Sequence, residues 1–501
     1  MGLTQYLELF SLINLFSALI LTSFIYLLKV NKIKLKRQRS TPLLDGPSAI
    51  IPYFGNALTF MIYPEDISSK LRYYTQKYGS RYRLWIGEKL SIVLADASDI
   101  EIALMGNKFL NKGKDFHELF GRAFKNGSFS SEGMDWKKSR KILQHSLKTN
   151  VLDNYVGVMN EETEKVIKEL SAKAKTMDIF DISDYIAPAP FNIICRTLYD
   201  LEGDPISTEQ LSTFRKAAGE FLGESFHLMF YPKLIRKIKQ QIYRKTIKTM
   251  LKDVEIAYNK VILEGKLNKS GNDENHGDGS STRFIKYLLN DDFSDEDKKA
   301  EIVTYSVGGS ETLTITICFV LLMLGMHNNI QDKVYKEQEL IFGDSDREVT
   351  ADDIKQMDYL EQVLKEVLRL FPLVPFFFRT AQEDVALGDI TLPANTELIF
   401  NVFAVHNNPT YFPNPETFDP EHFSKERCEN LPKGCYLPFT IGPRNCIGKA
   451  FAMYEMKIIC SIILRKFRIH TSMKIEDIKL KYSFVLNSAD GFKVSINERK
   501  K

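Results

Sequence analysis

The sequence predicts a mainly α-helical globular domain with small β-sheets, carried behind an N-terminal helix that spans a membrane. Three observations support this prediction. Apolar residues recur with helical spacing over long stretches, alternating residues indicate only a short β-hairpin, and the run Leu9–Leu28 contains neither charge nor proline. The composition, with 44% hydrophobic and 26% charged residues, is ordinary for a globular protein with a large core.

The first expected element is an anchor helix in residues 1–29. The run Leu9–Leu28 is long enough to cross the roughly 30 Å hydrocarbon core of a bilayer as a helix. Six basic residues lie between Lys29 and Arg39, whereas only Glu8 is charged before the run. The positive-inside rule therefore predicts a single span with the body of the protein in the cytosol. The alternative is a cleaved signal peptide, which is disfavoured because the apolar run is too long and no basic residue precedes it.

A linker and one large domain follow the anchor. Residues 30–52 are basic and contain three prolines, which prevent a continuous helix between the anchor and the body. Residues 53–501 show neither an internal repeat nor a second change in composition, so we expect a single domain there.

Within this domain the pattern is mostly helical. Alternation in Tyr82–Trp85 and Leu90–Leu94, on either side of Gly87, predicts a β-hairpin. Amphipathic spacing predicts long helices near residues 155–172, 234–264, 298–328, 354–370 and 448–466. The segment Lys266–Thr282 is polar and rich in glycine, asparagine and aspartate, so we expect a solvated loop.

Charge and cysteine content exclude two classes of protein. A net charge of +3 provides no general attraction for nucleic acid, and no nucleic-acid partner is expected. The six cysteines are few and irregularly spaced, which does not fit a disulfide framework and suits a reducing compartment.

The most informative motif is the segment Phe439–Gly448, which precedes the last predicted helix. It places a lone cysteine, Cys446, between Gly442 and Gly448, and a helix N-terminus that follows favours an anion such as a thiolate. The alternative, a buried structural cysteine in a loop, fits the other five cysteines well.

The segment resembles the cysteine motif of the cytochrome P-450 family, the haem-thiolate monooxygenases, and implies the cytochrome P-450 fold for residues 53–501. The resemblance implies that Cys446 ligates the iron of a non-covalently held haem b, that Phe439 covers the sulfur, and that Arg444 pairs with a haem propionate. Two further matches, the pair Trp136 and Arg140 and the single Arg379, are implied propionate contacts. An ordinary strand-edge arginine remains the alternative for Arg379.

The long helical stretch near 298–328 contains Gly308-Gly-Ser-Glu-Thr312, which resembles the family's oxygen-activation motif. The resemblance implies that Glu311 and Thr312 are the catalytic pair, with Glu311 relaying protons. The alternative is close helix packing at the two glycines with Glu311 at the surface, since glycine costs about 1 kcal/mol in a helix and needs a reason.

A structural motif of the family, Glu-x-x-Arg, is matched by Glu366 and Arg369, which share one helix face. The third cationic partner departs from the family pattern, because His422 stands where arginine is usual and its charge depends on pH.

The resemblance implies a monooxygenase that takes electrons from NADPH-cytochrome P-450 reductase, with cytochrome b5 as a further candidate donor, at the endoplasmic reticulum membrane. The donor would dock on a basic face formed by Lys137, Lys138 and Lys141, for which a solvated helix face is the alternative. Two other functions stay open: a haem-thiolate isomerase or dehydratase of lipid peroxides, and a membrane-anchored haem- or lipid-binding protein without turnover.

The closest resemblance is to the microsomal fatty-acid ω-hydroxylase branch, which includes many insect members. Many of those relatives carry a glutamate that esterifies the haem at the position of Gly308, so we expect haem without that ester and a lipophilic substrate of unassigned regiochemistry. The expected pocket walls are aromatic residues in two loop regions: Phe116, Phe120, Phe124 and Phe129, and Phe221, Phe226 and Phe230. The alternative is that these rings belong to the ordinary hydrophobic core. The formal glycosylation sites Asn126 and Asn268 are expected to be unmodified because both should face the cytosol.

Overall fold

The computed structural model describes residues 44–48, 54–62, 67–87, 89–201, 207–242 and 294–499, together with a few single residues elsewhere. The predicted anchor and most of the predicted linker, apart from a few single residues, lie outside the described residues. The predicted loop at residues 266–282, the site Asn268 and most of the predicted helix beyond Ile242 also lie outside them.

The described chain is mainly helical, with four small sheets. Its helices are α2 (Ala57–Ile62), α3 (Ile67–Tyr78), α4 (Ala97–Met105), α5 (Lys114–Phe124), α6 (Gly133–Leu143), α7 (Thr149–Leu152), α8 (Val156–Thr176), α9 (Ser183–Ile186), α10 (Pro188–Thr197), α11 (Thr208–Leu228), α12 (Lys233–Ile242), α15 (Asp295–Met326), α16 (Asn328–Phe342), α17 (Ala351–Gln356), α18 (Asp358–Leu370), α19 (Val402–His406), α20 (Lys425–Cys428) and α21 (Lys449–Lys466). Its strands are β1 (Arg81–Ile86), β2 (Lys89–Leu94), β3 (Phe180–Asp181), β4 (Phe376–Thr380), β5 (Val385–Leu387), β6 (Ile390–Leu392), β7 (Glu397–Asn401), β8 (Phe467–His470), β9 (Leu480–Tyr482), β10 (Leu486–Ser488) and β11 (Lys493–Glu498).

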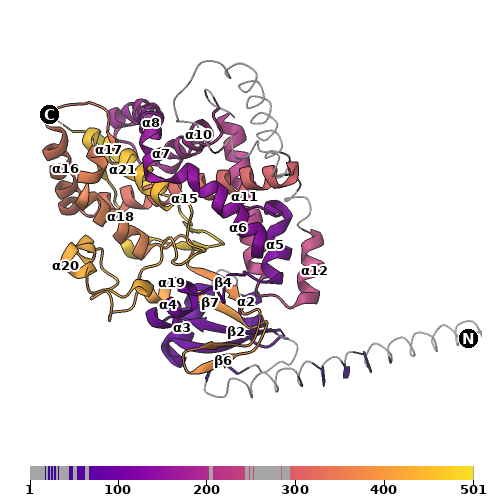
Figure 1. Ribbon diagram of the computed structural model, residues 1–501. Coiled ribbons are helices and arrows are strands. Elements are labelled where there is room, and N and C mark those ends of the chain that lie inside the picture. Colours follow the sequence, from indigo (N-terminus) through magenta and orange to yellow (C-terminus); the bar gives the residue numbers. More distant parts are fainter. Residues whose placement is uncertain are drawn as a thin grey trace, which may run out of the picture.

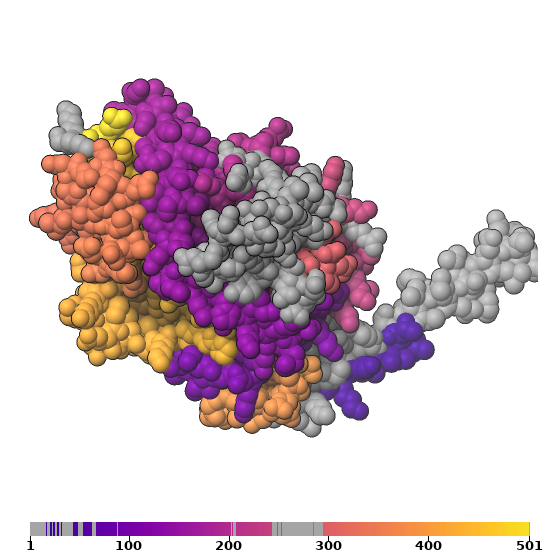
Figure 2. Space-filling view, turned by 45° about the horizontal axis from the view of Figure 1, so that its top comes forward, coloured from indigo at the N-terminus to yellow at the C-terminus, as the bar shows by residue number. Residues whose placement is uncertain are grey.

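The largest sheet joins distant parts of the chain. Its strand order is β1-β2-β7-β4, and the predicted hairpin β1–β2 is confirmed, with Gly87 in the left-handed region at φ 65°. Strand β7 runs parallel to β2, with Ile92 opposite Leu398. Figure 1 shows this sheet at one end of the molecule and the helices around α15 at the other. In the space-filling view, gold C-terminal segments lie against the purple N-terminal part (Figure 2).

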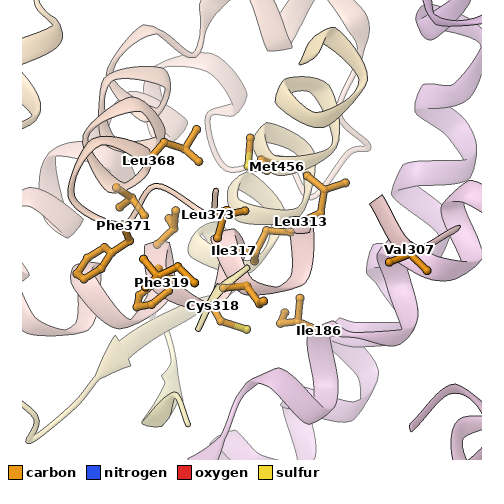
Figure 3. Close-up of a cluster of buried hydrophobic side chains, with 14 of the residues drawn as sticks. Ile186, Val307, Leu313, Ile317, Cys318, Phe319, Leu368, Phe371, Leu373 and Met456 are labelled. Carbon is orange, nitrogen blue, oxygen red and sulfur yellow. The ribbon is translucent and has the colours of Figure 1, made fainter. Parts of the chain in front are cut away.

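Helix α15 forms the centre of the helical part. Most of its side chains are buried, and Figure 3 shows Ile317 and Phe319 beside Leu368 and Phe371. The rings of Phe319 and Phe371 stack with centroids 4.3 Å apart. Among the described residues, α15 is the one helix long and apolar enough to cross a membrane, but 78% of its most apolar window is buried inside the protein. An all-round apolar helix that is covered by protein is a core helix.

The predicted helices near 155–172, 298–328 and 448–466 correspond to α8, α15 and α21. The helix predicted near 354–370 is confirmed as α18, but the start of the stretch belongs to a separate helix, α17, because the chain breaks at Met357 (φ −81°, ψ 68°). The reason is a tertiary contact: Glu337 of α16 accepts hydrogen bonds from the amides of Tyr359 and Leu360, which are unpaired donors at the start of α18.

The placement of the aromatic residues in loops is wrong for five of the seven, whereas Phe230 does lie in the turn that follows α11. Phe116, Phe120 and Phe124 lie on α5, where their spacing of four residues puts them on one helix face. Phe221 and Phe226 lie on α11. Phe129 does lie in the loop between α5 and α6.

Candidate active site

The loop that carries Cys446 is a tight turn held by its own backbone. The Cys446 amide donates to the Phe439 carbonyl oxygen at 2.8 Å. Thr440 and Gly442 have φ values of 54° and 78°, and a Cβ on Gly442 would lie 2.0 Å from the Leu104 carbonyl oxygen. Glycine at 442 is therefore required both by conformation and by the close approach of α4.

Cys446 is accessible although protein surrounds it. Its side chain is exposed, while burial raises the pKa of its thiol above the usual value; the Gly448 amide and the charge of Arg140 act in the opposite direction. Accessibility and desolvation occur together when a side chain lines an internal space. Burial thus favours the neutral thiol, and a bound metal ion would favour the thiolate.

Three cations converge beside this loop: Arg379 is buried, and Lys112 and Arg444 are half-buried. Burial lowers the pKa of Lys112 well below its usual value, and Arg444 and Arg379 lower it further. Burial and then Arg379 lower the pKa of Arg444 to about 9, and burial lowers that of Arg379 to about 10. Among the described groups that influence these pKa values, Glu132 is the one acid, so the cluster is short of negative charge.

The predicted pair Trp136 and Arg140 reaches the same place from α6. The Arg444 guanidinium lies 4.2 Å from the centre of the Trp136 ring, and its Nη2 donates to the Ser131 carbonyl oxygen at 2.6 Å. Arg140 Nη1 donates to the Asn445 carbonyl oxygen at 2.7 Å. Within the part of the chain that the structure describes, the buried Nε of Arg444 has no hydrogen-bond partner.

The cluster fits an anionic cofactor. Neighbouring, partly desolvated cations, with an unpaired guanidinium donor among them, are stabilised by a ligand carrying two negative charges, such as the two propionates of haem. Lys112 was missed from the sequence, because a lysine beside Gly113 is typical of a solvated loop. In the structure its Nζ donates to the Phe129 carbonyl oxygen at 2.7 Å.

The middle of α15 is accessible although most of the helix is buried. Gly308, Gly309, Glu311 and Thr312 all retain exposed surface. A Cβ on Gly309 would lie 2.4 Å from Ile194 Cδ1, whereas a Cβ on Gly308 would meet nothing within 4 Å. Close packing therefore explains Gly309 but not Gly308, which borders open space.

Glu311 and Thr312 already have partners. The Thr312 hydroxyl donates to the Gly308 carbonyl oxygen at 2.7 Å. Arg215 of α11 donates to Glu311 from Nε at 2.7 Å, in an ion pair whose two side chains are 23% and 22% exposed. Sequence reasoning missed Arg215, since nothing local links α11 to the centre of α15.

Aromatic rings from several elements form one continuous cluster. Phe120 contacts Phe221 and Phe484, with ring centroids 6.5 and 5.2 Å apart, and Phe226 contacts Phe484 at 6.3 Å. Lys112 Nζ lies 3.9 Å from the centre of the Phe129 ring. The aromatic cluster therefore borders the cation cluster.

The Glu366–Arg369 pair is fully buried. Arg369 binds both Glu366 oxygens at 2.7 Å, and His422 Nδ1 lies 3.2 Å from Glu366 Oε1. His422 Nε2 lies 2.7 Å from the Pro413 carbonyl oxygen. Both ring nitrogens face acceptors, and only an imidazolium donates from both, so His422 can provide the charge that arginine supplies elsewhere in the family.

Comparison with known proteins decides the family. The family model described as Cytochrome P450 matches residues 45–495. The chain belongs to the cytochrome P450 family. Similar relatives include Cytochrome P450 4c21 of Blattella germanica (30% identity over 90% of this chain and 92% of the relative) and Cytochrome P450 4V2 of Homo sapiens (30%, 89% and 88%). Cytochrome P450 4c3 of Drosophila melanogaster is 29% identical over 95% of this chain and 93% of its own.

Membership makes this P450 a haem-thiolate monooxygenase that acts on lipophilic substrates. The expected resemblance to the fatty-acid ω-hydroxylase-like branch is also confirmed, because the relatives 4c21, 4V2 and 4c3 all belong to P450 family 4.

Proposed function

We propose that this P450 inserts one oxygen atom of O2 into a lipophilic substrate with Cys446 as the iron ligand. The observation that carries the proposal is the accessible Cys446, on a tight loop beside the cluster of three cations. When bound, haem supplies the redox and oxygen chemistry, and the chain supplies ligation, orientation and proton positions.

The cofactor would be haem b, held without an ester because Gly308 offers no carboxylate. Arg444, Arg379 and Lys112 would hold the propionates as charge-assisted hydrogen-bond donors. Trp136 and Arg140 would add to this propionate site, with Trp136 stacked on Arg444 and Arg140 bound to Asn445. Phe439 would cover the sulfur, since the Cys446 amide donates to its carbonyl oxygen and keeps the two residues together.

Glu311 and Thr312 would move protons on the other side of the cofactor. The Thr312 hydroxyl has a second capacity, as an acceptor, that its bond to Gly308 leaves open. Glu311 forms a partly exposed ion pair with Arg215, so its carboxylate can leave Arg215 and turn towards the interior. This pair also favours a monooxygenase over a peroxide isomerase, which takes up no protons from solvent.

The substrate would be bulky and apolar. The aromatic cluster is built from α5, α11 and a C-terminal loop, and two of its described rings, Phe116 and Phe129, border a cation, Lys112. Fatty acids, hormone-like lipids and xenobiotics share this chemistry.

We also propose the domain order and location: an anchor in residues 1–29, a linker in 30–52 and a catalytic domain in 53–501 at the cytosolic face of the endoplasmic reticulum. Helix α12 supports a membrane position, because it buries Arg236 and Gln240 and exposes Leu234, Ile238 and Ile242 by 64%, 59% and 68%. A helix with an apolar outer face suits the bilayer interface.

Asn126 provides a test of this topology because it is exposed. We expect no sugar on Asn126 after expression in microsomes, whereas glycosylation there would place the domain in the lumen.

The electron donor would be NADPH-cytochrome P-450 reductase, with cytochrome b5 as a second donor. Lys137, Lys138 and Lys141 are exposed on α6, the helix whose buried side carries Trp136. Replacing the three lysines with glutamate should raise the reductase concentration needed for half-maximal turnover, with an unchanged haem spectrum.

The direct test of the function is reductase-dependent NADPH consumption by the full chain in lipid vesicles. We expect consumption to rise with a lipophilic ligand and to yield a hydroxylated product. Bound, reducible haem with no ligand-stimulated consumption would contradict a monooxygenase.

A further inference from the structure

His406, the last residue of α19, lies between α18 and the loop that carries Cys446. Its side chain is fully buried. Its Nε2 accepts a hydrogen bond from the Leu437 amide at 2.8 Å, and its Nδ1 lies 3.2 Å from the Arg369 carbonyl oxygen. The imidazole therefore bridges the last turn of α18 to the residue at which the cysteine loop begins.

The two partners fix the tautomer of His406, because both are backbone groups. An amide can only donate, so Nε2 is unprotonated and Nδ1 carries the hydrogen that the Arg369 carbonyl accepts. Burial, and then the charge of Arg369, lowers the pKa of His406 to about 3. The ring is neutral at physiological pH and cannot exchange its donor and acceptor roles.

The α18 side of this bridge is held by several contacts. The Arg369 guanidinium donates back to the His406 carbonyl oxygen at 2.9 Å and binds Glu366 at 2.7 Å. The His406 ring stacks on Tyr436 with centroids 5.3 Å apart, and the Tyr436 hydroxyl donates to the Lys365 carbonyl oxygen at 2.9 Å. His406 thus stands in a fixed position relative to α18.

The cysteine-loop side depends on few contacts. Thr440 is a non-glycine residue in the left-handed region, a conformation that persists only when the surroundings hold it. From Leu437 the loop turns back through three backbone bonds: Thr440 N to Leu437 O at 3.1 Å, Asn445 N to Gly442 O at 3.1 Å and Cys446 N to Phe439 O at 2.8 Å. A shift at Leu437 would therefore be passed directly to Cys446.

We propose that His406 is the positioning residue of the thiolate loop: its hydrogen bond to Leu437 transfers the fixed position of α18 to Cys446 and keeps the sulfur at bonding distance from the iron. The inference rests on the proposed role of Cys446 as the iron ligand. Arg140 binds the other end of the same loop through Asn445, so His406 and Arg140 hold the two ends of the loop in place.

Two variants separate the partners of His406. In His406→Gln the side-chain amide extends to the position of Nε2 and can accept from Leu437. In His406→Asn the shorter amide reaches only the position of Nδ1, towards Arg369. The measurement is the ferrous carbon-monoxide spectrum of the full chain, expressed as the ratio of bound haem with the red-shifted thiolate-type Soret band to haem with the neutral-thiol band.

We expect the ratio to fall about tenfold in His406→Asn, since an unpaired buried amide is left at Leu437, and to fall less in His406→Gln. The matched control is His470→Leu, which removes a partly buried histidine bonded to Asn497 Oδ1 at 2.6 Å, away from the loop. A merely structural role would lower haem content and thermal stability in all variants but leave the type of band unchanged.

An equal ratio in His406→Asn, His406→Gln and His470→Leu would overturn the inference, and so would a lower ratio in His406→Gln than in His406→Asn. Failure of the underlying function has a different signature: the unaltered chain would show no thiolate-type band, or Cys446→Ser would retain it.

Discussion

Replacing Arg379 with methionine should stabilise the haem-free protein and at the same time weaken its hold on haem. Burial lowers the pKa of Arg379 from 12.5 to about 10. With Arg379 3% exposed, this shift means that holding its charge in the folded, haem-free chain costs about 3 kcal/mol at neutral pH. A lowered pKa of a base means that the folded state favours the neutral form, so the cost is fully present at pH 7 and disappears only as the pH rises above about 10.

Methionine keeps much of the volume but loses the hydrogen bond from Arg379 Nη1 to the Phe378 carbonyl oxygen at 2.8 Å. That bond contributes about 1 kcal/mol, so the haem-free variant should be more stable by about 2 kcal/mol. In the loaded protein the charge would face a propionate, and a hydrogen bond between charged groups contributes about 1.5–3 kcal/mol. Haem should therefore dissociate roughly 10- to 100-fold faster from the variant.

The assays are the urea midpoint of the haem-free chain and the rate of haem transfer to an excess of a haem-binding acceptor protein. Arg427→Met is the control, because Arg427 is an exposed arginine, 3.3 Å from Asp419, and neither quantity should change. A haem-free Arg379→Met chain that is less stable than the unaltered chain, with unchanged haem transfer, would refute the account of the cation cluster.

Three other changes have defined outcomes. Thr312→Val keeps the shape but removes the hydroxyl, so NADPH consumption should continue while product per NADPH falls by about tenfold or more, measured as product against NADPH; unchanged coupling would exclude Thr312 from proton delivery. Arg215→Met releases Glu311 from a partly exposed ion pair, so the free energy of unfolding should change by less than about 1 kcal/mol. The solvent isotope effect on turnover should fall, and an unchanged isotope effect would exclude Arg215 from proton delivery. The lowered pKa of His406 stabilises the fold above pH 6.5 and this contribution is lost as the pH falls towards about 3. By pH 5 the loss is about 2 kcal/mol. The unfolding midpoint of His406→Leu should therefore depend less on pH between 6.5 and 5 than the midpoint of His470→Leu, which keeps His406. Parallel pH profiles of the two variants would contradict a buried, neutral His406.

The local parts of the fold follow from the sequence. The hairpin β1–β2 and the helices α8, α15 and α21 are encoded by periodicity and by Gly87, and the cysteine loop by the spacing of its glycines. In each case the residues that determine the conformation are neighbours in the chain.

The rest depends on contacts between distant residues. The break at Met357 exists because Glu337 of another helix binds the first amides of α18. Lys112 belongs to the cation cluster because the folded chain brings it next to Arg444 and Arg379, and Arg215 meets Glu311 for the same reason. Periodicity and motif spacing do not contain this information.

The adjacent glycines of α15 also show what sequence alone leaves open and what contacts between distant residues decide. Sequence alone left two explanations for Gly308 and Gly309, space for a ligand or close helix packing. The structure assigns close packing to Gly309, where Ile194 leaves no room for a Cβ, and open space to Gly308. Close packing therefore accounts for Gly309, whereas space for a ligand at Gly308 stays a prediction.

The most direct test of the account is the carbon-monoxide difference spectrum of the dithionite-reduced protein, with Cys446→Ser measured beside it. Cys446 as the iron ligand predicts a strongly red-shifted Soret band that is lost in Cys446→Ser. A band at the position typical of a neutral ligand in properly folded protein, or a red-shifted band that persists in Cys446→Ser, would contradict the central claim.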